Sequence, residues 1–274
     1  MKKALLILLT LLTLQHAFGQ QTQFQSIYSV NRTVELSSTL GLFAYNAVGF
    51  KLLNSKPRLD SLEIATLDAS SIWAFDRVAT EQSAANRHNA ADISDVAMNA
   101  SIVVPFFLLF DKAVRRDWAN LLVLYAETQA INTAFYVMTA GAFDRKRPFV
   151  YNQDVSIDDK MGPGTRISFF SGHVSTPAAA SFFAAKVYCD YHPEIGAKKY
   201  WLYTAALIPP AVVGYYRFKA MKHFPTDVIT GTLVGAATGV LIPQLHKIKV
   251  GNDNLSLLPF AGRTTGVRIN YSFN

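Results

Sequence analysis

Three short stretches of the chain combine basic side chains, imidazoles and one carboxylate at close spacing. They are Arg145-Lys146-Arg147-Pro148, then Ser171-Gly172-His173, then Arg217 with His223 six residues later and Asp227 four residues after that. Guanidinium groups make paired hydrogen bonds to the oxygens of a tetrahedral anion. A phosphoryl group in transfer spreads negative charge over its oxygens, so it needs fixed cations and N–H donors around it. The three stretches together predict a site for phosphoryl transfer.

The third stretch has the residue types of an activated nucleophile. A helix that starts at Pro225 would place His223 and Asp227 on one face, because residues four apart are neighbours there. The carboxylate of Asp227 would then fix one ring nitrogen of His223 and leave the other free to attack. We therefore predict His223 as the nucleophile and Asp227 as the group that orients it.

The other two stretches supply the expected anion-binding groups. Ser171 and Gly172 come directly before an apolar helical run, so their backbone N–H groups would lie at the positive end of a helix. Glycine also permits close approach of an anion to the backbone. Arg147 and Arg217 are the expected guanidinium ligands, and Arg145 and Lys146 are further candidates for binding the phosphate.

In order and spacing, the three stretches resemble the three signature motifs of the type 2 phosphatidic acid phosphatase (PAP2) superfamily, which also includes the vanadium haloperoxidases and the bacterial nonspecific acid phosphatases. The resemblance covers roughly residues 93–244. It implies an all-α helical bundle of the PAP2/vanadium haloperoxidase type and a covalent phosphohistidine on His223. It also implies that His173 protonates the leaving oxygen and later draws a proton from water. Neither a metal nor another cofactor is expected.

The chain departs from the family pattern at three positions. Phe170 stands where the second motif usually has proline, and Tyr216 stands where serine usually precedes the arginine of the third motif. The phosphate-binding lysine expected seven residues before Arg147 is replaced by Ala140. Arg145, Lys146 or Lys222 could supply the missing cation, and the sequence does not choose among them.

Apolar periodicity predicts helices that hold these stretches in place. The expected helices are residues 93–110, 118–143, 173–189, 199–216 and 225–241, with a softer segment, residues 34–53, that packs on the core or lies at an interface. Residues 255–273 alternate apolar and polar side chains around Gly262 and Gly266, which is typical of a hairpin. The predicted division is a signal peptide (1–19), an N-terminal helical or interfacial segment (20–92), the catalytic core (93–249) and a tail (250–274).

The first residues read as a secretory signal: Lys2 and Lys3 precede an apolar run, and small residues at Ala17 and Gly19 suit cleavage after Gly19. An uncleaved anchor is the alternative. Cys189 is the single cysteine, so no internal disulfide can form.

Half of the residues are apolar, 16% are charged, and the net charge is +7. Each predicted helix is near the length that spans a bilayer, about 17–25 residues. If residues 34–53 do not cross, counting the passes puts the loop of residues 143–171 outside and the cations at positions 112, 115, 116, 198, 199, 247 and 249 inside. This predicts a bacterial inner-membrane protein whose site faces the periplasm, with a soluble or peripheral periplasmic protein as the alternative.

A phosphorylated lipid is the substrate expected of such a site; phosphatidic acid, phosphatidylglycerophosphate, polyprenyl diphosphate and lipid A phosphates all remain open. The alternatives are a noncatalytic membrane scaffold, a vanadium-dependent haloperoxidase and a soluble acid phosphatase. The basic residues form no helix face or aromatic platform for nucleic acid, which excludes that partner. His88, His192 and His246 are read as surface or interfacial residues, and Glu127, Gln129 and Asn132 as groups that hydrogen-bond between helices.

Overall fold

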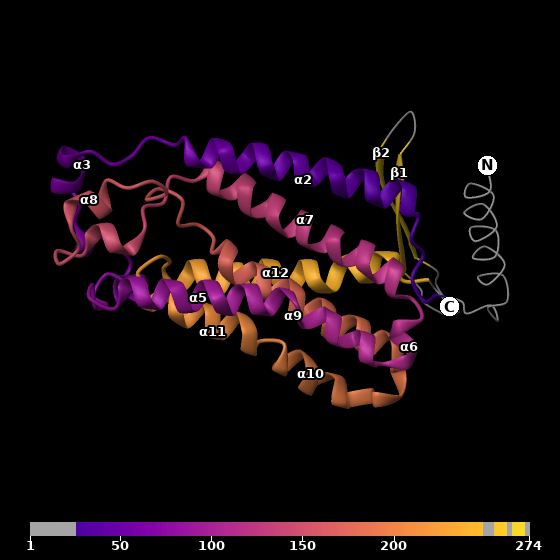
Figure 1. The fold of residues 1–274 in the computed structure, drawn as a ribbon. Coiled ribbons are helices and arrows are strands. Elements are labelled where there is room, and N and C mark those ends of the chain that lie inside the picture. Colours follow the sequence, from indigo (N-terminus) through magenta and orange to yellow (C-terminus); the bar gives the residue numbers. More distant parts are fainter. Residues whose placement is uncertain (1–25, 249–254, 262–264, 272–274) are drawn as a thin grey trace, which may run out of the picture.

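The computed structural model describes residues 26–248, 255–261 and 265–271, and within them the chain is a helical bundle with a C-terminal hairpin (Figure 1). The longer helices are α2 (Arg32–Asn54), α5 (Arg87–Ile102), α7 (Trp118–Ala142), α9 (Gly172–Tyr191), α11 (Ile208–Lys219) and α12 (Pro225–His246). Shorter α-helices are α3 (Ser61–Ala65), α4 (Ala74–Arg77), α6 (Lys112–Arg115), α8 (Ile157–Lys160) and α10 (Lys199–Ala205). The 3₁₀ turns are η1 (Ala69–Ser71), η2 (Val104–Phe110), η3 (Pro148–Tyr151) and η4 (Pro193–Lys198). The predicted all-α fold is confirmed.

Proline decides where two of the predicted helices begin and break. Pro225 is the first residue of α12, as predicted, because that position has no intrahelical partner for an amide hydrogen. The single helix predicted over residues 199–216 is wrong: it is divided into α10 and α11. Pro209 and Pro210 carry no amide hydrogen for the carbonyls one turn earlier, so α-helical hydrogen bonding is interrupted before them.

Helices α9 and α12 pack so closely that their backbones touch. A Cβ added at Gly231, Gly235 or Gly239 would lie 2.5, 2.1 or 2.6 Å from a backbone carbonyl oxygen of α9 or of the residue before it. Small residues at every fourth position let two helices approach in this way. The contact brings the start of α9 and the start of α12, which carry two of the predicted motifs, to the same end of the bundle.

Helix α2 runs along α7 for most of the length of the bundle (Figure 1). Tyr28, just before α2, pairs with Lys247 at one end, whereas Lys56, just after it, donates to the Ala140 carbonyl oxygen at the other (2.7 Å). Packing of this segment on the core is confirmed. The count of membrane passes in which residues 34–53 do not cross is wrong for a bundle that spans a membrane. Tyr28 and the loop of residues 143–171 lie at opposite ends of the bundle, so this segment adds one pass.

The outer surface of the bundle is apolar where a water-soluble protein is usually polar. Leu40, Leu52, Val96, Phe110 and Leu233 are each exposed by 64–81%. Among the described residues, two helical segments, Arg87–Phe110 and Pro225–His246, are long and apolar enough to cross a bilayer. Both observations favour association with a membrane.

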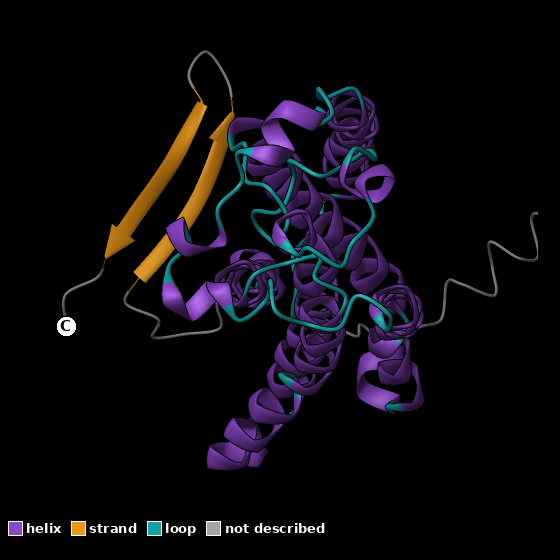
Figure 2. Ribbon diagram, turned by 90° about the vertical axis from the view of Figure 1, so that its left-hand side faces the viewer, coloured by secondary structure: helices purple, strands orange, loops and turns teal. Residues whose placement is uncertain are grey.

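The C-terminal strands form the predicted hairpin. β1 (Leu255–Ala261) pairs antiparallel with β2 (Thr265–Tyr271), with Leu255 opposite Tyr271. Figure 2 shows this ribbon beside the helices rather than among them. The signal peptide and its cleavage site after Gly19 lie outside the described residues.

Candidate active site

The three predicted stretches meet at the end of the bundle where α9 and α12 begin. Backbone hydrogen bonds join the loops that carry them: Ser168 N–H donates to the Arg145 carbonyl oxygen (3.0 Å), and Phe149 N–H donates to that of Met221 (3.1 Å). Ser171 N–H donates to the Asp227 carbonyl oxygen (3.0 Å). Stretches that are far apart in the sequence therefore form one rigid site.

His223 lies in the centre of this site, with 1% of its surface exposed. Met221, two residues earlier, has a left-handed backbone (φ 53°), a conformation uncommon for a residue with a side chain. The Nδ1–H of His223 donates to the Ser168 carbonyl oxygen at 2.7 Å, which leaves Nε2 with its lone pair. Burial, then the charges of Arg147 and Arg217, lower the pKa of His223, so the ring is neutral and nucleophilic at neutral pH.

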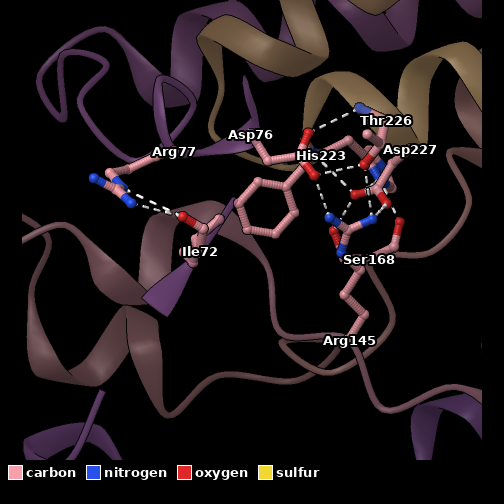
Figure 3. Close-up of polar contacts among 9 residues, drawn as sticks. Ile72, Asp76, Arg77, Arg145, Ser168, His223, Thr226 and Asp227 are labelled. Carbon is pink, nitrogen blue, oxygen red and sulfur yellow. Dashed lines mark hydrogen bonds and ion pairs between the residues drawn. The ribbon is translucent and has the colours of Figure 1, made fainter. Parts of the chain in front are cut away.

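Asp227 does not bond the ring as predicted. Its Oδ2 lies 3.9 Å from His223 Nδ1 and instead accepts from Ser168 Oγ (2.6 Å) and Phe224 N–H (2.9 Å) (Figure 3). Because the Ser168 carbonyl oxygen accepts from the ring, Asp227 acts on His223 through Ser168. A helical spacing of four residues could not reveal this intermediate, which lies 55 residues away from His223 in sequence.

Arg145 and Lys146, predicted to bind phosphate, instead contact carboxylates of the protein. Arg145 lies between the carboxylates of Asp76 (2.6 Å) and Asp227 (2.5 Å), over the ring of Phe224. Lys146 pairs with Glu63 (3.7 Å). These pairs hold the segment after α2 against the motif loops, which indicates a structural role for both cations.

Three polar atoms in the site are buried without a hydrogen-bond partner among the described residues: Arg147 Nε, Arg217 Nε and Ser171 Oγ. A buried polar group left unpaired destabilises a fold by about 1–3 kcal/mol, more for a charged group. A bound ligand can supply the missing partners. Two guanidinium N–H donors and a hydroxyl around a buried imidazole fit a tetrahedral oxyanion.

The start of α9 fits the anion-binding expectation in part. The Ser171 N–H is already used in the bond to Asp227, so it is not available to a ligand. Gly172 is the first residue of α9, where helix N–H groups have no intrahelical partner. A Cβ there would lie 2.9 Å from the ring of Tyr136, so only glycine fits without displacing that ring.

Asp95 on α5 belongs to the site and was missed in the sequence. Its carboxylate pairs with Arg217 and lies 3.4 Å from His173 Nε2. The signal that could have found it is a carboxylate inside an apolar helix, which usually faces a bundle interior or a cavity. Its partners, however, lie 78 and 122 residues later in the sequence, so no local pattern links them.

Lys222 is the cation next to His223 in the sequence. Its ammonium lies 5.3 Å from the centre of the Phe149 ring, and within the described ranges no carboxylate forms an ion pair with it. Burial, then the charges of Arg147 and Arg87, lower its pKa to about 8. His173 is close enough to Lys222, Arg147 and Arg217 to feel all three charges. The site thus gathers two guanidinium groups, one ammonium and two imidazoles.

Comparison with known proteins matches nearly half of the chain to a family model. Residues 117–250 match the family model of the PAP2 superfamily. A solved structure, the first transmembrane PAP2-type phosphatidylglycerolphosphate phosphatase from Bacillus subtilis, is similar over 74% of this chain and 93% of that one, at 18% identity and a TM-score of 0.42. No curated protein matches the sequence.

Proposed function

We propose that this chain, whose residues 117–250 match the PAP2 superfamily model, is a phosphatase that hydrolyses a phosphate monoester or pyrophosphate of a lipid through a phosphohistidine on His223. The observation that carries the proposal is a set of buried donors around His223, which lack a hydrogen-bond partner in the part of the chain that the structure describes: Arg147 Nε, Arg217 Nε and Ser171 Oγ. A noncatalytic scaffold would gain nothing from keeping these donors buried beside a neutral imidazole.

The reaction runs in two displacements. His223 Nε2 attacks phosphorus, the bond to the leaving oxygen breaks, and the imidazolium of His173 gives its proton to that oxygen. A water molecule then gives a proton to His173 and attacks phosphorus, the P–N bond breaks, and inorganic phosphate leaves. Among the described residues, Asp95 is the acidic group that forms an ion-pair contact with His173, at 3.4 Å from its Nε2.

Lys222 replaces the phosphate-binding lysine that the first motif lacks at Ala140. Ala140 is fully buried, and Arg145 and Lys146 are engaged by carboxylates. Lys222, by contrast, lies near Arg147 and Arg217 without an ion-pair partner among the described residues. It therefore supplies the third positive charge for the phosphoryl oxygens.

The surroundings of the site favour a lipid over a water-soluble ester. A groove between α5 and α11 is lined by Asn89, Ile93, Tyr216 and Lys219, and the chain continues from Tyr216 directly into Arg217. The outer faces of the bundle are apolar, so a membrane lipid can approach the bundle from the side. The lipid phosphates named above remain the candidate substrates.

Phosphate release from a panel of lipid phosphates by wild type and by His223→Ala tests the proposal. Wild type should hydrolyse at least one, and His223→Ala should lose at least 1,000-fold, because removing a covalent nucleophile removes most of the rate enhancement. His88→Ala, at a ring that is 73% exposed, is the matched control and should stay active. Equal rates for wild type and His223→Ala would support a scaffold. Halide oxidation that requires vanadate would support a haloperoxidase.

We place the protein in the bacterial inner membrane with the site facing the periplasm. Because α2 runs most of the bundle, this orientation puts Tyr28 and Lys247 on the cytoplasmic side, with the cations of residues 112–116 and 198–199. Cleavage after Gly19 would deliver Tyr28 to the periplasm instead, so in a spanning bundle the two predictions exclude each other. Protease cleavage of the loop of residues 151–166 in intact spheroplasts tests the orientation, and protection of that loop would reverse it.

A further inference from the structure

A second cluster of titratable side chains lies away from the site, toward the end of the bundle where α12 finishes. Glu35 on α2, Glu127 on α7 and His246 on α12 point one ligand atom each at a common centre, within 4.8 Å of one another. Their side chains are 18%, 11% and 15% exposed. The prediction that His246 is a surface or interfacial residue without partners is therefore wrong. Glu127 also differs from Gln129 and Asn132, which hydrogen-bond to α9 as predicted.

We propose that Glu35, Glu127 and His246 bind one divalent first-row metal ion, with Zn²⁺ as the best match. His246 Nε2 lies 3.2 Å from Glu35 Oε1 and 3.6 Å from Glu127 Oε2. Ligand atoms about 2.1 Å from a tetrahedral Zn²⁺ ion are separated by about 3.4 Å from one another. The two separations from His246 Nε2 are thus close to those of neighbouring ligands around one ion, and the two glutamate oxygens lie within 4.8 Å of each other.

The ring of His246 is fixed in the form that ligates a metal. Its Nδ1 lies 2.9 Å from the Ile242 carbonyl oxygen, which can only accept, so Nδ1 carries the hydrogen. Histidine ligands commonly donate their second ring nitrogen to a backbone carbonyl in this way. A cation between His246 Nε2 and the two carboxylates would bind the nitrogen lone pair and one oxygen of each glutamate.

The charge of the cluster also calls for a cation. Within the described residues neither glutamate pairs with a lysine or arginine, and His246 is the shared partner of both. Glu127 is only 9% exposed, and its buried Oε2 has no hydrogen-bond partner among the described residues. With a metal bound through His246 Nε2 and both ionised carboxylates, the ligand set carries a charge of −2, which one divalent ion balances. Nitrogen and carboxylate ligands in small number favour Zn²⁺ over Ca²⁺ or Mg²⁺, which prefer more oxygen ligands.

Such an ion would tie three helices together at the end opposite the catalytic loops, so its role is structural. It does not depend on the proposed phosphatase activity, since none of the three ligands belongs to that site. Removal of the ion is therefore expected to lower stability while phosphate release from lipid substrates by the folded protein continues.

The test uses the full chain, purified without a histidine tag, stripped with a chelator and titrated with ZnCl₂. Wild type should bind one Zn²⁺ per chain, and its melting temperature should rise with Zn²⁺. Co²⁺ in its place should give the visible absorption of a tetrahedral site. Glu127→Gln, Glu35→Gln and His246→Ala should each weaken Zn²⁺ binding at least tenfold.

His192→Ala is the matched control. His192 also contacts two carboxylates, Glu194 through Nδ1 (2.8 Å) and Asp111 through Nε2 (3.1 Å), but from opposite sides of the ring, so these cannot share one ion. It should bind Zn²⁺ as wild type does. Absence of Zn²⁺ binding by wild type would overturn the proposal. So would unchanged binding by Glu127→Gln, which keeps the side-chain shape even if His246→Ala fails to fold.

Discussion

Replacing Lys222 by methionine tests whether this ammonium is the third phosphate ligand. Methionine keeps the length and apolar stem of the side chain, so the packing over Phe149 is largely retained. What is lost is one positive charge beside Arg147 and Arg217. The side chains of His223 and His173 are both kept in this variant.

The structure gives the size of the expected effect. Burial and neighbouring cations lower the pKa of Lys222 from its ordinary value of 10.5 to about 8, a difference that corresponds to about 3 kcal/mol. A phosphoryl dianion bound between these cations attracts the Lys222 ammonium and offsets its repulsion by the neighbouring arginines. Allowing for screening at a half-buried site, Lys222→Met should lose about 2–3 kcal/mol of transition-state stabilisation, or about 30- to 150-fold in kcat/KM.

The pH dependence separates this role from a structural one. Lys222 is charged below its pKa and neutral above it, so kcat/KM of wild type should fall as the pH rises through about 8. Lys222→Arg stays charged, so its fall should move to higher pH. Lys222→Met should show a low rate without this alkaline fall. A kcat/KM of Lys222→Met within twofold of wild type would refute the reasoning. So would a fall in kcat/KM near pH 8 that is unchanged in both Lys222→Arg and Lys222→Met.

Two further predictions concern residues whose contacts are already defined. Asp95→Asn removes the negative charge that competes with a bound anion for Arg217. Inorganic phosphate should therefore inhibit this variant about tenfold more strongly than wild type, an effect of about 1.4 kcal/mol. Unchanged or weaker competitive inhibition would contradict this. Gly235→Ala places a Cβ 2.1 Å from the Ser175 carbonyl oxygen and should lower the free energy of unfolding by more than about 2 kcal/mol in thermal or denaturant melts. Gly41→Ala, which meets nothing within 4 Å in α2, should instead stabilise by about 0.5–1 kcal/mol, and equal melting temperatures would contradict the packing argument.

Local signals in the sequence were sufficient for most of the helices. Residues 118–143 and 173–189 are apolar enough over sufficient length that their helices formed within two residues of the predicted ends. Pro225 fixed the start of α12 because proline suits the first helical turn. The same chemistry was overlooked at Pro209 and Pro210, where an apolar run concealed the break between α10 and α11.

The sequence by itself determined the residue types of the site, because the spacing of Arg217, His223 and Asp227 is short and each carries specific chemistry. Only the tertiary structure decided which of these side chains contact one another. Ser168 rather than Asp227 holds His223, and Asp95 pairs with Arg217, since these contacts join segments 55 and 122 residues apart. The same holds for Glu35, Glu127 and His246, each unremarkable in its own helix. Hydrogen bonds and charges act over a few ångströms in space, and only folding brings such distant stretches within that range.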